Sequence, residues 1–159
     1  MAAFKYDYAV GGIITAPAQA VGEMLETLSN SPTGLTPKTL VDANRAEGSL
    51  LHNEFEWRDD VAAEKYRENQ AAKIIRNVVI IENTTNDEEE DRPVRGFCST
   101  PGGIGNYVTL QTALTNEVYK AKLMEDAKRD AKAFLGKYRR LEKLASVNNA
   151  IERFLHDVG

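Results

Sequence analysis

The sequence of residues 35–81 is LTPKTLVDANRAEGSLLHNEFEWRDDVAAEKYRENQAAKIIRNVVII, and its patterns determine most of the expected fold. The pair Thr36-Pro37 predicts the start of a helix, because a threonine hydroxyl caps the first backbone amides and proline fits the first helical position. We expect this helix to end at Gly48 and a short helix to follow at residues 49–52.

The second half of this stretch predicts a longer helix that passes into a strand. Asp59 and Asp60 are placed to cap a helix over residues 61–75 and to favour its positive end. From Ile74 to Ile81 the residues become largely β-branched, which is typical of a strand.

Two further segments, residues 94–99 and 107–110, alternate in the manner of short strands. With the strand that ends at Ile81, they predict a small antiparallel sheet or ribbon. The acidic run Asp-Glu-Glu-Glu-Asp at residues 87–91 lies in the loop between the first two strands. We interpret this run as a flexible hairpin tip; the alternatives are an acidic decoy for a basic partner and a mask for a basic face.

Before residue 35 the chain contains one predicted helix and an extended arm. Apolar residues recur at spacings of three and four from Val21 to Leu28, which predicts a helix that starts near Pro17. Residues 1–16 carry scattered aromatic and apolar side chains, and we expect this arm to lie against another surface.

The C-terminal third is strongly helical in composition. From Leu114 to Leu155 there is no proline and one glycine, Gly136. The segment therefore either folds back near Gly136 or projects as one long helix that pairs with another chain. From Leu114 to the end the chain carries ten Lys or Arg against seven Asp or Glu, so a basic face for phosphates is one interpretation. We favour the other, an oligomerisation helix. The residues assigned to oligomerisation are Phe134, Tyr138, Leu141, Leu144 and Ile151.

Together these patterns predict an α+β fold that is mainly α-helical with a small antiparallel β-sheet or ribbon. We divide the chain into an N-terminal arm (residues 1–16), a cluster of short helices with the small sheet (residues 17–112) and a long C-terminal helix or helical hairpin (residues 113–159).

The composition indicates a cytoplasmic protein. The net charge of −4 argues mildly against nucleic-acid binding by bulk charge. The single cysteine, Cys98, fits a reducing compartment, and no apolar run approaches the ~20 residues of a membrane span. The first residues lack the basic and apolar regions of a signal peptide. We therefore expect no membrane association.

Sequence signals for catalysis are weak. The two histidines, His52 and His156, are far apart in the sequence, and one cysteine cannot form a thiolate metal site. The glycines at residues 102–103 lack the lysine and hydroxyl residue of a phosphate-binding loop. We predict a protein that is not an enzyme, with no catalytic residue, no metal site and no cofactor.

Residues 35–76 form the strongest sequence candidate for nucleic-acid binding, because several short helices joined by turns are compatible with a helix-turn-helix-like region. The residues assigned to nucleic-acid binding are Lys38, Arg45, Arg58, Arg67 and Arg76. Acidic residues are interleaved with them, so an ordinary solvated face is the alternative. Phe55 and Trp57 are most simply core anchors, and His52 a packed or capping residue.

The motif LLHxxFEWxDDxAAxxYR at residues 50–67 resembles a family of small bacteriophage and prophage proteins that are generally labelled hypothetical. A weaker resemblance extends to the strand region and to residues 137–141, so that it covers roughly two thirds of the chain. The family has no established activity to transfer to single residues. The resemblance implies a phage or prophage gene and, with it, the cytoplasm of a bacterial host. The N-terminal arm and the acidic run have no counterpart in it.

Two functional hypotheses follow. The first is a phage-encoded, non-enzymatic nucleic-acid-associated protein, either a regulator or an accessory of DNA metabolism, that dimerises through its C-terminal helix. The alternative is a homo-oligomeric structural or assembly protein of the phage, or one that binds a host or phage protein. We favour the first by a small margin, on analogy with other small phage proteins.

Overall fold

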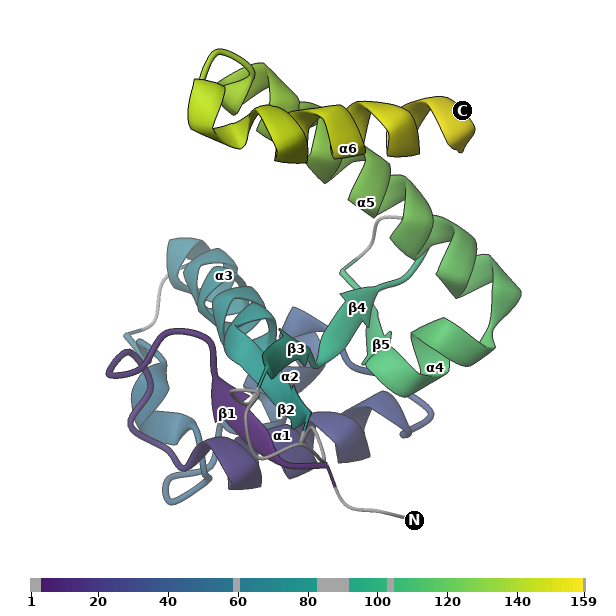
Figure 1. The fold of residues 1–159 in the computed structure, drawn as a ribbon. Coiled ribbons are helices and arrows are strands. Elements are labelled where there is room, and N and C mark those ends of the chain that lie inside the picture. The colour runs from purple at the N-terminus through teal and green to yellow at the C-terminus, as the bar shows by residue number, and fades with distance from the viewer. Residues whose placement is uncertain (1–3, 59–60, 83–91, 103–104, 159) are drawn as a thin grey trace.

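The computed structural model describes residues 4–58, 61–82, 92–102 and 105–158, and it confirms a mainly helical α+β fold with small antiparallel sheets (Figure 1). The helices are α1 (Ala18–Ser29), α2 (Pro37–Ala43), α3 (Val61–Asn77), α4 (Leu110–Thr115), α5 (Glu117–Tyr138) and α6 (Ala145–Asp157), with 3-10 turns η1 (His52–Glu54) and η2 (Glu142–Leu144). The strands are β1 (Tyr6–Tyr8), β2 (Val78–Glu82), β3 (Arg92–Arg95), β4 (Phe97–Ser99) and β5 (Tyr107–Thr109).

Helix α2 begins as the sequence predicts but ends earlier. The Thr36 hydroxyl accepts a hydrogen bond from the Thr39 amide at 3.0 Å, and Pro37 occupies the first helical position. The helix ends at Ala43 rather than at the predicted Gly48, and the buried Asn44, not a glycine, is its C-cap residue. The Asn44 side chain donates to the carbonyl of Leu40 and accepts from the amide of Leu51.

Helix α3 runs directly into strand β2, as the change to β-branched residues predicts. The helix ends at Asn77, two residues beyond the predicted end at residue 75, and the strand begins at Val78. The predicted caps Asp59 and Asp60 and the acidic run at residues 87–91 lie outside the described residues.

Strand β2 is the central strand of the three-stranded sheet, and the N-terminal arm supplies one of its neighbours. Strand β1 pairs antiparallel with β2, with Tyr6 opposite Ile80, so the arm lies against the chain's own core. The predicted strand at residues 94–99 is wrong as one element. It divides at Gly96, where a side chain would come within 3.0 Å of the Val78 carbonyl, and β4 pairs with β5 in a separate sheet.

The contact between β1 and α1 depends on a glycine within the helix. A Cβ at Gly22 would lie 2.0 Å from Cγ of Tyr6, so only glycine lets the Tyr6 ring lie against α1. The same ring stacks on Phe97 at 6.2 Å, and its hydroxyl donates to Glu26 at 3.0 Å. The pKa of Tyr6 is raised, first by burial and then by this hydrogen bond.

The hydrophobic core lies between the helices α1 to α3 and the three-stranded sheet. Its largest fully buried apolar side chains are Val21, Leu25, Leu35, Leu40, Val41, Leu51, Ile75 and Val78. They come from α1, α2, α3, β2 and the connections between them, which explains why this part of the chain folds as one unit.

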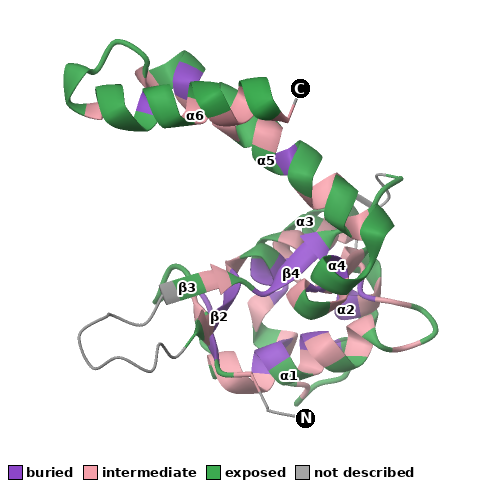
Figure 2. Ribbon diagram, turned by 45° about the vertical axis from the view of Figure 1, so that its right-hand side comes forward, coloured by how far each residue is buried: buried purple, intermediate pink, exposed green. Residues whose placement is uncertain are grey.

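The C-terminal third folds back on itself. The turn between α5 and α6 occupies residues 139–144, whereas Gly136 lies within α5, so the reversal lies three residues beyond the predicted hinge. We call residues 117–158 the hairpin and residues 1–116 the body. The hairpin stands away from the body (Figure 1), and Figure 2 shows that buried residues are concentrated in the body, while most of the hairpin is exposed or half-buried.

Candidate functional site

Three of the predicted nucleic-acid-binding residues belong to a charge network between α2 and α3. Lys38 contacts Asp42 at 2.8 Å, and Arg45 bridges Asp42 at 2.9 Å and Glu64 at 2.7 Å. Hydrogen bonds, chiefly from Lys38 to Asp42 and from Arg67 to Glu64, lower the pKa of both carboxyl groups. The network ties the two helices together and leaves little uncompensated positive charge there.

Arg67 lies inside the fold rather than on a binding surface. Its side chain is only 5 % exposed and pairs with Glu64 at 2.9 Å. It also donates to the backbone carbonyl of Glu56 at 2.8 Å and lies 5.2 Å from the Trp57 ring. A guanidinium held in this way cannot reach a phosphate without breaking these contacts, so its role is to support Trp57 and the segment before α3.

The other two predicted residues are exposed. Arg58 contacts Glu56 at 3.0 Å, and its hydrogen bonds lower the pKa of that carboxyl group. Arg76 lies exposed in the last turn of α3, and within the described part of the chain it has no ion pair. The five predicted residues therefore do not form one free basic surface.

The segment between α2 and α3 is longer than the short turn of a helix-turn-helix motif. It spans residues 44–60 and contains the first part, LLHxxFEWxDD, of the motif at residues 50–67. The Trp57 ring stacks on His52 at 4.9 Å, and its Nε1 donates to the His52 carbonyl at 2.7 Å. Phe55 is buried beside Trp57. Phe55, Trp57 and His52 are thus packed structural residues, as the simpler interpretation of the sequence held.

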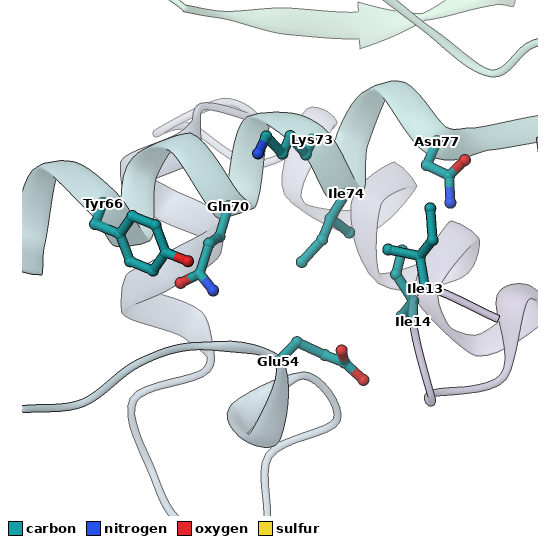
Figure 3. A pocket seen from close by; sticks show the side chains of 8 residues that line it. All are labelled: Ile13, Ile14, Glu54, Tyr66, Gln70, Lys73, Ile74 and Asn77. Atoms are coloured by element: carbon teal, nitrogen blue, oxygen red, sulfur yellow. The ribbon is translucent and has the colours of Figure 1, made fainter. Parts of the chain in front are cut away.

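A groove lies between the N-terminal loop and α3 (Figure 3). Its volume is about 360 Å³, and the lining side chains come from the loop, η1 and α3: Ile13, Ile14, Glu54, Tyr66, Gln70, Lys73, Ile74 and Asn77. The buried Ile14 and Ile74 supply apolar surface, whereas Ile13 and Tyr66 are 64 % and 54 % exposed. Sequence reasoning did not find this groove, because residues 13 and 74 meet only in the tertiary fold.

Hydrogen bonds hold the loop in place against α3 and η1. Asn77 accepts from the Val10 amide at 2.9 Å and donates to the Val10 carbonyl at 3.1 Å. Glu54 accepts from the Thr15 amide at 2.8 Å. Apolar surface with a polar rim can hold a small amphipathic group, but no arrangement of charges here specifies one.

The hairpin has a net positive charge, whereas the body has a net negative charge. Residues 117–158 contain ten Lys or Arg and seven Asp or Glu, for a net charge of +3 with histidine neutral. Residues 1–116 contain ten Lys or Arg and seventeen Asp or Glu, for a net charge of −7. The overall acidity therefore conceals a basic projection on an acidic body, and this separation suits a hairpin that meets a polyanion.

The basic residues of the hairpin are densest at the tip, around the turn that follows α5. Lys137, Arg139, Arg140 and Lys143 fall within seven positions, and all four are exposed. Arg139 lies 3.6 Å from Glu152, whereas Arg140 and Lys143 have no ion pair among the described residues. We call these four residues the basic tip.

Some other charges of the hairpin are paired. Asp126 of α5 is 7 % exposed and accepts from both Lys122 and Arg129. These hydrogen bonds, with that of Lys122 the largest cause, lower the pKa of Asp126. Lys128 donates to the carbonyl of Val158, where the exposed carbonyls at the end of α6 favour a cation.

All five residues assigned to oligomerisation lie in the hairpin. The Phe134 and Tyr138 rings are 4.9 Å apart and half-buried, as are Leu144 and Ile151, while Leu141 is 52 % exposed. The fully buried side chains between the two helices are few. In the far half of the hairpin they are Leu135 and Asn148, and the Asn148 Oδ1 has no hydrogen-bond partner among the described residues.

Within the described ranges, no group of three or more His, Cys, Asp or Glu is arranged to hold a metal ion. In the same ranges no helix combines the length and the apolar character that crossing a membrane requires. Cys98 is a buried free thiol on β4 whose pKa is raised, chiefly by burial.

The chain was compared with models of protein families, with curated proteins and with solved structures, and none of the three comparisons gives a match.

Proposed function

We propose that the chain is a non-enzymatic nucleic-acid-associated protein that contacts phosphates with the basic tip of its α5–α6 hairpin. This keeps the function expected from the sequence and moves the contact surface from α2 and α3 to the hairpin. The origin implied by the resemblance, a phage or prophage gene, is part of the same proposal.

The observation that carries the proposal is the separation of charge between hairpin and body. A negatively charged body repels nucleic acid at long range, so contact is favoured only where the chain projects a basic element beyond that body. Arg140 and Lys143 have no acidic partner among the described residues, so they can bind phosphate without breaking an ion pair. Tyr138 adds a half-buried aromatic ring beside the cluster, next to Lys137 at 5.1 Å.

The test is fluorescence anisotropy with labelled single- and double-stranded DNA at about 50 and 200 mM salt. Binding through phosphates weakens steeply as the salt concentration rises. The double variant Arg140→Glu/Lys143→Glu is expected to reduce the affinity at least about tenfold and to lower the salt dependence by about one phosphate contact per residue.

A matched control is available on α3. Lys73 and Arg76 are also exposed, also three positions apart and also without an ion pair among the described residues. The variant Lys73→Glu/Arg76→Glu therefore makes the same change in net charge on the body. Equal losses for the two variants would indicate bulk charge rather than the basic tip.

Absence of DNA binding by the wild-type chain at low salt would contradict the proposal. The assembly or protein-binding function predicted as the alternative would then become the one to pursue.

A further inference from the structure

The turn between α5 and α6 is built from residues that favour helix. Residues 139–144 are Arg-Arg-Leu-Glu-Lys-Leu, and Arg, Leu, Lys and Glu all rank high in helix propensity. Glycine or asparagine just after a helix, or proline soon beyond it, is the usual stop signal. None of these occurs between Lys137 and Val147, so the local sequence does not specify the end of α5.

The backbone departs from helical geometry over a short distance. Arg139 has φ −52° and ψ −32°, and Ala145 has φ −56° and ψ −42°, both helical. Leu141 between them has φ −81° and ψ 105°, which is extended, and η2 follows it directly. Leu144, just before α6, also departs from helical geometry, with φ −102° and ψ 10°. A change of the few turn residues from Leu141 to Leu144 to helical geometry would join α5 and α6 into one helix of about 60 Å.

The start of α6, like that of α1, lacks a side-chain cap. Side-chain oxygens of Thr36, Thr109 and Asn116 cap the first amides of α2, α4 and α5. Leu144, at the start of α6, offers no such hydrogen bond. In a continuous helix these amides bond to the carbonyls of the preceding turn, so folding back leaves a helix end that straightening removes.

Two of the hydrogen bonds that close the hairpin are symmetric about residue 143. The side-chain Nδ2 of Asn148 donates to the Tyr138 carbonyl at 3.3 Å, and Lys128 donates to the Val158 carbonyl. If α5 and α6 form one straight helix, two such helices from two chains can pack antiparallel. The same pairs of residues then meet, but α6 of each copy lies against α5 of the other. Leu141, 52 % exposed in the closed hairpin, then lies near the two-fold axis, where its partner copy covers it.

From these four observations we infer that the hairpin opens at residues 139–144 and exchanges α6 with a second copy, which gives a domain-swapped dimer. In that dimer, α6 of the second copy covers the apolar face of α5. It fits this face because, in the monomer, the chain's own α6 covers the same face. The inference goes beyond the proposed function and does not depend on nucleic-acid binding.

Two changes to the turn test this inference in opposite directions. Deletion of residues 140–143 removes about one helical turn, so α6 keeps its phase but the chain is too short to fold back. Insertion of Gly-Gly between Leu141 and Glu142 lengthens the turn and interrupts a continuous helix. The masses are measured by size-exclusion chromatography with light scattering after refolding at high protein concentration. Emission of the single tryptophan, Trp57, checks that the body is folded.

The wild-type chain is expected to give separable monomer and dimer that interconvert slowly, the deletion variant only dimer, and the insertion variant only monomer. A deletion variant that is monomeric with native Trp57 emission overturns the inference, as does a wild-type chain that remains monomeric after concentrated refolding. If the deletion variant does not fold, the insertion variant tests the inference by itself. If the insertion variant forms as much dimer as the wild-type chain, the dimer contact lies elsewhere and the inference is wrong.

Cross-linking distinguishes exchange of α6 from simple association of closed hairpins. In a Cys98→Ser background, one chain carries Lys128→Cys and the other Val158→Cys, and the two are refolded together. Exchange brings these positions of different chains together, so a short bis-maleimide is expected to link unlike chains. A dimer that forms without this cross-link rules out the exchange.

Discussion

The body and the hairpin are both mainly helical, but different forces maintain them. In the body, α2 and α4 begin at side-chain caps although α1 does not, and large, fully buried apolar side chains join α1, α2, α3 and β2. In the hairpin, α5 begins at a side-chain cap but α6 does not, and few side chains are buried between the two helices. The comparison indicates that tertiary contacts fix the body in one arrangement, whereas the hairpin depends on a few contacts that a second copy can also supply.

The largest expected effect comes from removing a core side chain in the body. Ile75 is fully buried, so Ile75→Ala is expected to cost about 2–5 kcal/mol of unfolding free energy, measured by urea titration of Trp57 emission. The matched change in the hairpin is Leu135→Ala, at a side chain that is 4 % exposed. It is expected to lower the helical circular dichroism while the Trp57 transition shifts by less than about 0.5 kcal/mol. Equal shifts of the Trp57 transition in both variants would show that body and hairpin unfold as one unit.

Two glycines within helices provide the next contrast. Gly22→Ala is expected to destabilise the body by about 1–3 kcal/mol, because the new Cβ overlaps the Tyr6 ring that holds β1 against α1. Gly136→Ala is expected to stabilise the hairpin by about 0.5–1 kcal/mol, since nothing lies within 4 Å of its new Cβ and alanine is the better helix former. Thermal unfolding followed by Trp57 emission and by circular dichroism measures the two effects. A neutral Gly22→Ala would contradict the close packing of β1 on α1.

The smallest effect is the response to acid. The pKa values of Asp42 in the body and Asp126 in the hairpin are lowered from the ordinary value of 3.8, so each carboxylate stabilises the folded state above that pH. This contribution is lost as the pH falls through the lower folded pKa. The melting temperature is therefore expected to decline from about pH 5 to pH 3.

The variants Asp42→Asn and Asp126→Asn separate the two regions in that titration. Asp42→Asn is expected to flatten the decline reported by Trp57, and Asp126→Asn the decline reported by circular dichroism alone. A decline that neither variant alters would assign the acid sensitivity to other carboxylates.

Elements with local signals could be predicted from the sequence. The start of α2 at Thr36 and Pro37, the passage from α3 to β2 and the general position of α1 follow from caps, spacing and β-branching, which depend on near neighbours in the chain. The predicted end of α2 at Gly48 was wrong, because the side chain of Asn44 bonds to a residue in the following turn.

The candidate nucleic-acid surface could be predicted only in part. The basic composition of the C-terminal third was visible in the sequence, and the basic tip lies within it. The assignment of Arg67 to binding was undermined by a fact that no spacing reveals, namely that Trp57 and Glu64 enclose its guanidinium. Whether a charged side chain is buried depends on which segments pack together, so it cannot be predicted from composition.

The sequence by itself determined the approximate positions of α1, α2, α3, β2 and β5, and that the C-terminal third is helical and basic, because these properties arise from residues within a few positions of one another. Only the tertiary structure decided that the N-terminal arm completes the sheet, that Arg45 and Arg67 pair with Glu64 and that the C-terminal segment reverses at residues 139–144. The physical reason is the same in each case. Contacts between residues far apart in the chain supply the free energy, and at the hairpin turn that energy overrides residues which by themselves favour a continuous helix.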